Sequence, residues 1–134
     1  MAHFLGGLIA FLGYFGGAVA LAVIYLFLYV RITPHREFDL IVKEHNASAA
    51  IALSSSLVGF VVPMSRAVAQ ATSIVEFAAW GLVALVVQVG AYYAARLAHP
   101  NLSKAIEENS LSAAIWLGAV SLSAGLLSAA AMTE

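Results

Sequence analysis

Histidine and carboxylate side chains, which can bind metals or transfer protons, lie only at the margins of this chain's long apolar segments. Because imidazole and carboxylate groups are ordinary metal ligands, His35, His45 and His99 with nearby acids offer one conceivable metal site. A haem-binding bundle needs histidines inside its membrane helices, and none lies there. The chain has no cysteine and no nucleophile, zinc-protease, phosphate-loop or dinucleotide motif. We therefore expect solvated loop histidines, no metal, no other cofactor and no catalytic group.

Gln88 is a polar side chain within the apolar segment 77–95. At about 1.5 Å per helical residue, it is about 18 Å from Glu76 and about 12 Å from Arg96, near the centre of a bilayer. The role we expect is an interhelical hydrogen bond, which contributes roughly 0.6 kcal/mol in a membrane. The alternative that stays open is a group lining a polar path.

Three consecutive serines, Ser54, Ser55 and Ser56, lie in another apolar segment. At about 100° per residue they span about 200° of a helix surface, so they cannot share one face. We expect at least one hydroxyl to bond the backbone four residues earlier. Together with Gln88 and Ser121, these serines are candidates for helix packing or for the lining of a polar path.

Arg66 and Glu76 flank a short connection between two apolar segments. A carboxylate inside a membrane would be a functional candidate, but Glu76 lies where a span begins, and a helix N-terminus favours negative charge. We expect a membrane-edge ion pair between the two residues, or a helix cap.

Membrane-spanning helices must position all of these side chains. The 134 residues are 63% hydrophobic and 10% charged, against about 45–50% and 25% in soluble domains. Four segments carry no charge, namely 4–30, 46–65, 77–95 and 109–133. Each is long enough to cross about 30 Å of hydrocarbon as a helix, and none alternates as a barrel strand does. The sequence predicts an all-α integral membrane four-helix bundle forming a single transmembrane domain over residues 1–134.

The cationic residues predict how the bundle is oriented. Five of the six Lys and Arg residues lie in segments 31–45 and 96–108, and only Arg66 lies on the opposite side. The positive-inside rule therefore places both segments in the cytoplasm and both termini outside, in the periplasm. We expect the first span to be retained, because it lacks the basic start of a signal peptide and its apolar run continues to Val30.

The chain also resembles itself at an offset of 64 residues. Thirteen of 37 positions in segment 17–53 are identical to those in 81–117, including the polar pairs Tyr29/Tyr93 and Glu44/Glu108. Each half holds two spans, an even number of crossings. We therefore predict two parallel two-helix repeats, about 1–65 and 66–134, related by an axis along the membrane normal.

Each span carries small residues at a spacing of three or four, which places them on one helix face. These four small-residue stripes are Gly6, Ala10, Gly13, Gly17 and Ala20; Ser48, Ala52, Ser55 and Gly59; Gly81, Ala84, Gln88, Ala91 and Ala95; and Ala114, Gly118, Ser121, Gly125 and Ser128. Small residues let helix backbones approach closely in lipid, so we expect a closely packed bundle.

Two short helices are expected in the cytoplasmic connections. Thr33 and Pro34 form an N-cap and first-turn proline, and the apolar residues that follow favour a segment lying in the membrane interface. Pro100 begins an analogous stretch that contains Leu102 and Ile106.

Four stretches carry a family resemblance. They are Arg31-Ile-Thr-Pro-His-Arg-Glu37, Asn46-Ala-Ser-Ala-Ala50, Phe77-Ala-Ala-Trp-Gly81 with Gln88, and Ser128-Ala-Ala-Ala-Met-Thr133. Together they resemble the YjfL-like proteins of bacteria, the domain-of-unknown-function family numbered 350, essentially from end to end. The resemblance implies a small bacterial inner-membrane protein built from a duplicated pair of spans. It supplies no catalytic residue, because the family has no established activity.

These observations favour a non-enzymatic membrane protein over other classes. A net charge of −1 gives no basic face for nucleic acid, so the expected partners are the lipid bilayer, further copies of the chain and an envelope protein. We expect an oligomeric accessory or anchoring component of the cell envelope. The alternative is a small-solute or ion channel or carrier subunit, and a membrane enzyme using Glu76 or the histidines is least favoured.

Overall fold

A computed structural model describes residues 2–32 and 37–132, and the ordered secondary structure in these ranges is entirely helical. The helices are α1 (Ala2–Ile32), α2 (Glu37–Val42), α3 (Ala47–Gln70), α4 (Ile74–Ala98), α5 (Leu102–Glu107) and α6 (Leu111–Ala131). The four long ones are apolar and long enough to cross a membrane. The all-α class and the four candidate spans are therefore confirmed. α3 continues through Arg66 to Gln70, beyond the uncharged segment 46–65.

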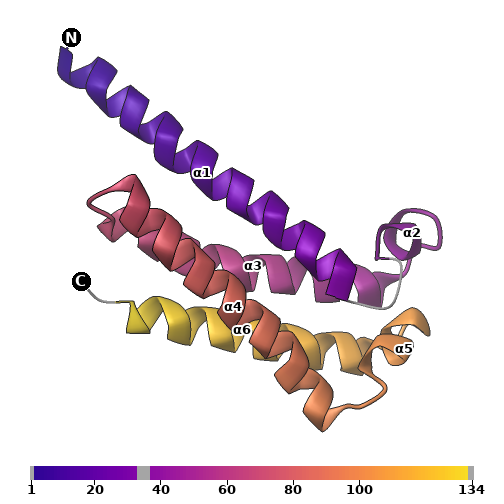
Figure 1. The fold of residues 1–134 in the computed structure, drawn as a ribbon. Coiled ribbons are helices and arrows are strands. Elements are labelled where there is room, and N and C mark those ends of the chain that lie inside the picture. Colours follow the sequence, from indigo (N-terminus) through magenta and orange to yellow (C-terminus); the bar gives the residue numbers. More distant parts are fainter. Residues whose placement is uncertain (1, 33–36, 133–134) are drawn as a thin grey trace.

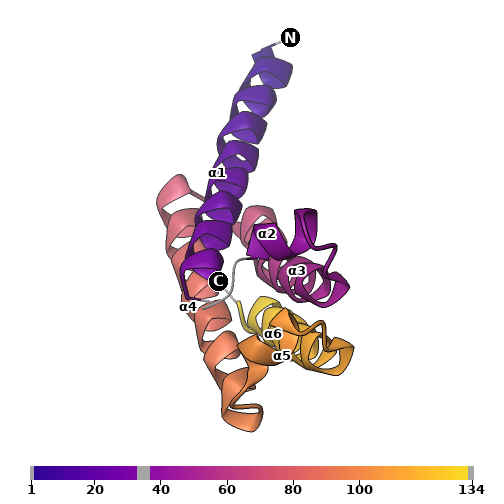
Figure 2. The ribbon, with the colours of Figure 1, turned by 90° about the vertical axis from the view of Figure 1, so that its right-hand side faces the viewer.

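α3 and α6 form the centre of the bundle and lie side by side in the same direction (Figures 1 and 2). Both begin at the end of the molecule that carries α2 and α5. α4 packs across both of them, whereas α1 contacts α3 and α4. α1 begins and α6 ends at the opposite end of the bundle (Figure 1).

Glycines allow the close approach of α3 and α6. A Cβ atom added to Gly59 would lie 2.5 Å from the Ser121 carbonyl oxygen, and one added to Gly125 would overlap the Gly59 carbonyl. A Cβ at Gly118 would lie 2.8 Å from that of Ser55. Backbone contact of this kind replaces the hydrophobic effect as a source of helix association in lipid.

The second half of α1 is held by aromatic rings. Tyr25 stacks on Phe60 of α3 with ring centroids 4.9 Å apart, and Tyr29 meets Tyr92 of α4 edge to face at 6.2 Å. Offset-stacked and edge-to-face pairs are the favoured geometries for aromatic rings. Tyr14 also meets Phe77 of α4 edge to face at 5.6 Å, and the start of α1, where residues 2–13 are exposed, extends beyond the bundle (Figure 2).

Asparagines tie the starts of α3 and α6 together. Asn46 caps α3 by accepting from Ala49 N at 2.9 Å, and its amide nitrogen donates to the Ile106 and Glu107 carbonyls at 2.9 and 3.2 Å. Asn109, at φ 63°, accepts from Ser48 N at 3.1 Å. Asparagine tolerates this left-handed backbone better than most residues.

The connecting helices are packed into the protein. Leu102 and Ile106 of α5 are both 0% exposed, and Leu40 of α2 is buried as well. Leu102 and Ile106 thus pack where α5 contacts α3 and α6, whereas Val42 of α2 is 66% exposed. The interfacial position of the two short helices stays a prediction. The cap expected at Thr33 and Pro34 lies outside the described residues.

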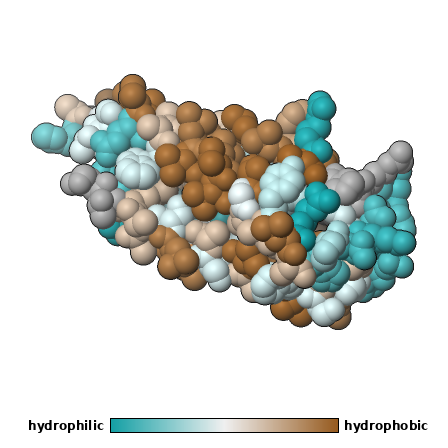
Figure 3. Space-filling view, turned by 60° about the horizontal axis from the view of Figure 1, so that its bottom comes forward, coloured by the Kyte–Doolittle hydropathy of each residue, from teal (hydrophilic) through white to brown (hydrophobic). Residues whose placement is uncertain are grey.

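The surface is divided as a membrane protein requires. Apolar side chains gather over the middle of the face in Figure 3, and hydrophilic ones concentrate at the end that carries α2 and α5. Large apolar side chains are exposed along α1, α4 and α6, among them Phe4, Ile9, Val86 and Leu127. In hydrocarbon this exposure is favourable, because lipid tails are as apolar as the side chains.

Candidate functional site

The polar centre of the bundle is built around Gln88 of α4, which is 1% exposed. Its Nε2 donates to the Gly59 carbonyl of α3 at 2.9 Å and to the Ser121 carbonyl of α6 at 3.1 Å. One side chain of α4 therefore connects this helix to both α3 and α6.

Pro63 explains why Gly59 can accept this bond. In an α-helix the Gly59 carbonyl would bond the N–H of residue 63, but α3 has proline there and proline has no N–H. The freed carbonyl is buried between helices, where an unpaired acceptor costs roughly 1–3 kcal/mol. Gln88 supplies the missing donor.

Hydroxyls extend the polar centre. Ser56 Oγ lies 3.3 Å from Ser121 Oγ, both residues are 1% exposed, and the Tyr25 side chain of α1 lies beside Ser56. The structure thus brings Gln88, Ser56 and Ser121 together.

Ser54 and Ser55 lie apart from these three residues. Ser55 packs against Gly118. Ser54 is exposed and donates to the Ile51 carbonyl at 3.3 Å, three residues earlier rather than four. The three consecutive serines do diverge around the helix, as their angular spacing requires.

The chemistry available at this centre is hydrogen bonding by neutral groups. Gln88 Oε1 is buried and has no hydrogen-bond partner among the described residues. A flipped amide would direct Oε1 at two carbonyl oxygens and remove both bonds, so the network fixes the orientation. The amide, the hydroxyls and the carbonyls hold helices together and leave one acceptor unused.

Arg66 and Glu76 do not pair with each other in the part of the chain that the structure describes. Arg66 Nε donates to Gln70 Oε1 at 3.0 Å within α3. Glu76 Oε2 accepts from the Thr72 hydroxyl at 2.6 Å, and Glu76 N donates to Ser73 Oγ at 3.1 Å. Glu76 therefore belongs to the N-terminal cap of α4.

Within residues 2–32 and 37–132, no three His, Cys, Asp or Glu side chains gather in an arrangement that could hold a metal ion. His45 and His99 lie in separate connections, after α2 and after α4. His35, the third member of the conceivable metal site, lies outside the described residues.

Comparison with known proteins places the chain in a family. Residues 3–132 match the family described as Domain of Unknown Function (DUF350). The chain belongs to the DUF350 family. It is 42% identical over 131 residues to the UPF0719 inner membrane protein YjfL of Escherichia coli K12, covering 98% of each chain, and equally so to that of strain O157:H7. No solved structure matches it.

The predicted resemblance to this family is thereby confirmed. With four candidate spans and this homology, the DUF350 chain is a multi-pass inner-membrane protein. The description of the family names no reaction or ligand, so the contacts of the chain itself must support any functional proposal.

Two kinds of site residue were not predicted from the sequence. Pro63 lies four positions after Gly59 and signals a freed carbonyl in α3, so this spacing could have revealed the acceptor. Asn46 and Asn109, 63 positions apart, join the connection before α3 to the connection before α6. No local pattern in the sequence indicates that pairing.

Proposed function

We propose that this inner-membrane protein self-associates through the first half of α1 and acts as a non-enzymatic accessory or anchoring component of the cell envelope. One observation carries the proposal. Three of the four small-residue stripes are buried or half-buried inside the bundle, whereas Gly6, Ala10 and Gly13 of α1 are exposed.

The exposed part of α1 is suited to a second helix. A Cβ added to Gly6 meets no atom within 4 Å, and one added to Gly13 meets only Ile74 at 3.9 Å. An apolar groove of about 390 Å³ lies between Phe15 of α1 and Val68 of α3, on a different face of α1 from Gly6 and Gly13. Close helix approach over small residues gives a further copy a place to pack.

Internal duplication supports two parallel repeats, about 1–65 and 66–134. α3 and α6 begin 64 residues apart, at Ala47 and Leu111. His45 and Asn109, also 64 apart, are the two non-glycine residues with positive φ in the described chain. Asn46 and Ser110 are the N-caps that follow. The connections before α3 and α6 thus repeat one local structure.

A cysteine cross-link tests the self-association. The chain has no cysteine, so Ala10→Cys introduces a single thiol on the exposed stripe of α1. Ala119→Cys places one on the exposed face of α6 as a matched control. After mild oxidation in native-lipid nanodiscs, we expect a disulfide-linked dimer from the first variant and monomer from the second.

Gly6→Leu combined with Gly13→Leu should abolish the cross-link at position 10, because the leucines separate the helices. A monomeric wild-type protein without a co-purifying partner overturns the proposal. Equal cross-linking at positions 10 and 119 also overturns the proposal, because random collisions between protein molecules in the membrane then explain the disulfide-linked dimer.

The second candidate function is a channel or carrier subunit, which the unpaired Gln88 Oε1 at the bundle centre favours. Purified protein in liposomes should then pass ions, water or polyamines faster than protein-free liposomes, and Gln88→Leu should remove the difference. Absence of flux contradicts this function, and unchanged flux in Gln88→Leu removes Gln88 from the path.

A further inference from the structure

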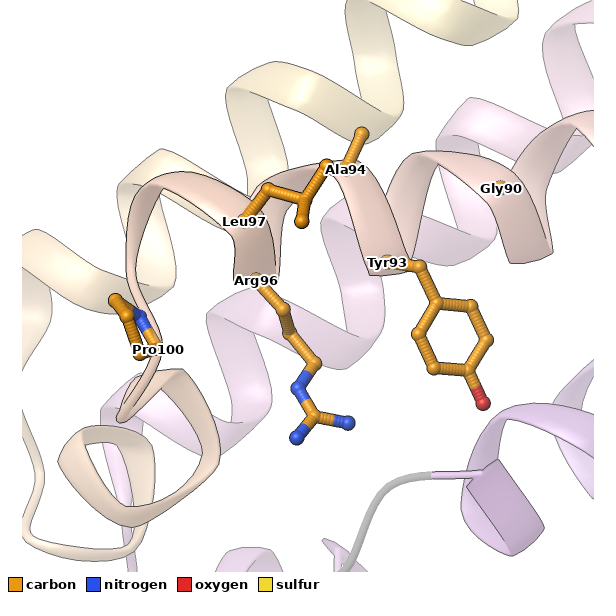
Figure 4. Close-up of a pocket in the computed structure, with 6 residues that line it drawn as sticks. All are labelled: Gly90, Tyr93, Ala94, Arg96, Leu97 and Pro100. Atoms are coloured by element: carbon orange, nitrogen blue, oxygen red, sulfur yellow. The ribbon is translucent and has the colours of Figure 1, made fainter.

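The last two turns of α4 form a groove that the central polar contacts do not involve. It has a volume of about 610 Å³ and is lined by Gly90, Tyr93, Ala94, Arg96, Leu97 and Pro100. Figure 4 shows Tyr93 and Arg96 extending to one side of α4, whereas Ala94 and Leu97 point to the other. The groove therefore has a polar flank and an apolar flank.

The polar flank carries the cation Arg96. The Arg96 guanidinium lies 5.9 Å from the Tyr92 ring centroid and 6.0 Å from that of Tyr93. Among the described residues, no carboxylate lies within ion-pair distance of it, and no acid lines the groove. Stacking on rings leaves the guanidinium N–H groups, which bind phosphate in a bidentate manner, available to a ligand.

The apolar flank is open to hydrocarbon. A Cβ added to Gly90 meets no atom within 4 Å, and Leu97 is 85% exposed. Arg96 lies in the last turn of a candidate span, where a phospholipid has its phosphate, and tyrosine is enriched at that depth. An acyl chain can therefore lie over Gly90 while the phosphate of the same lipid reaches Arg96.

We propose that this groove binds one anionic phospholipid, with its phosphate held by Arg96 and Tyr93 and an acyl chain packed over Gly90. The uncompensated charge selects an anionic over a zwitterionic lipid, because no carboxylate in the groove attracts a choline or ethanolamine group. Basic pockets at the membrane edge recognise lipid headgroups in this way. The proposal is independent of self-association through the first half of α1, a different helix.

Native mass spectrometry of the full chain, released from bilayers containing phosphatidylglycerol and phosphatidylcholine, tests the site. Wild-type protein should retain phosphatidylglycerol selectively. Arg96→Gln should weaken its binding by about tenfold, the lower end of what a charge-assisted hydrogen bond contributes. Gly90→Leu, which keeps the charge and fills open space, should also weaken it.

Arg31→Gln is the matched control. Arg31 lies in the last turn of α1, with its guanidinium 4.9 Å from the Phe27 ring centroid, but it does not line the groove. Its replacement should change phosphatidylglycerol binding less than twofold. Equal losses in Arg31→Gln and Arg96→Gln overturn the proposal, because general surface charge then explains binding.

Two other outcomes also overturn the proposal. Equal retention of phosphatidylcholine and phosphatidylglycerol shows an apolar groove without headgroup recognition. Displacement of the lipid by millimolar inorganic phosphate shows a site for a soluble anion, because a lipid held also by its acyl chain resists that competitor.

Discussion

At the residue scale, Pro63 and Gln88 form a complementary pair. Proline removes the helical partner of the Gly59 carbonyl, and the glutamine amide on a different helix replaces it. Glycine at position 59 is needed for the same contact, because a side chain there would meet the Ser121 carbonyl. The Gly59 carbonyl that proline leaves without a helical donor thus attaches α4 to α3.

Gln88→Leu should lower the free energy of unfolding by about 1–3 kcal/mol, because the buried Gly59 carbonyl loses its donor. In a Pro63→Ala background the loss should be smaller, since alanine at that position restores the helical N–H. Reversible unfolding in mixed micelles measures both values. If the losses in free energy of unfolding from Gln88→Leu and Pro63→Ala simply add in the double variant, the hydrogen bond between Gln88 and the Gly59 carbonyl is not what Pro63 makes necessary.

At the element scale, α3 and α6 are held by backbone contact, whereas α1 is held by side chains. Gly59 and Gly125 bring the α3 and α6 backbones together. α1 reaches the bundle through Tyr25 and Tyr29 and also through Tyr14, which packs on Phe77 of α4. Backbone contact requires glycine at defined positions, but aromatic contacts tolerate changes elsewhere on the helix.

Gly125→Ala should destabilise the protein by about 1–3 kcal/mol, because its Cβ overlaps the Gly59 carbonyl and forces the helices apart. Gly90→Ala is the control, since Gly90 faces open space and alanine is the better helix former by about 1 kcal/mol. A loss of stability in the control that equals the loss in Gly125→Ala would refute the close packing of α3 on α6.

At the scale of the whole molecule, α1 begins and α6 ends at the same end of the bundle, opposite α2 and α5 (Figure 1). A chain that crosses the membrane an even number of times ends on the side where it began. The charge distribution predicts that the α2 and α5 end faces the cytoplasm. This orientation is a prediction that the fold alone does not decide. The helices pack in the same way whether the termini face the periplasm or the cytoplasm.

Single cysteines test the orientation in intact cells. Ala69→Cys, near the α3–α4 connection, should react with a membrane-impermeant maleimide, whereas Asn101→Cys, before α5, should react only after the inner membrane is opened. Both positions are exposed, so a difference reports sidedness rather than burial. The reverse pattern would place both termini in the cytoplasm.

Sequence by itself determined the four candidate spans and the membrane class, and it placed Gln88 within the third span. Only helices and closed barrels satisfy their backbone hydrogen bonds internally and can cross hydrocarbon, and charged residues mark where these helices end. The family resemblance likewise rested on residues readable in order, from Arg31 to Thr133.

Tertiary structure decided which of the small-residue stripes are buried and what Gln88 bonds. All four stripes look alike in sequence, yet those of α3, α4 and α6 lie inside the bundle and that of α1 remains largely exposed. It also showed that Ser56, rather than Ser54 or Ser55, reaches Ser121. The physical reason is that helix period fixes which residues share a face, while the partner of each face depends on how separate helices cross.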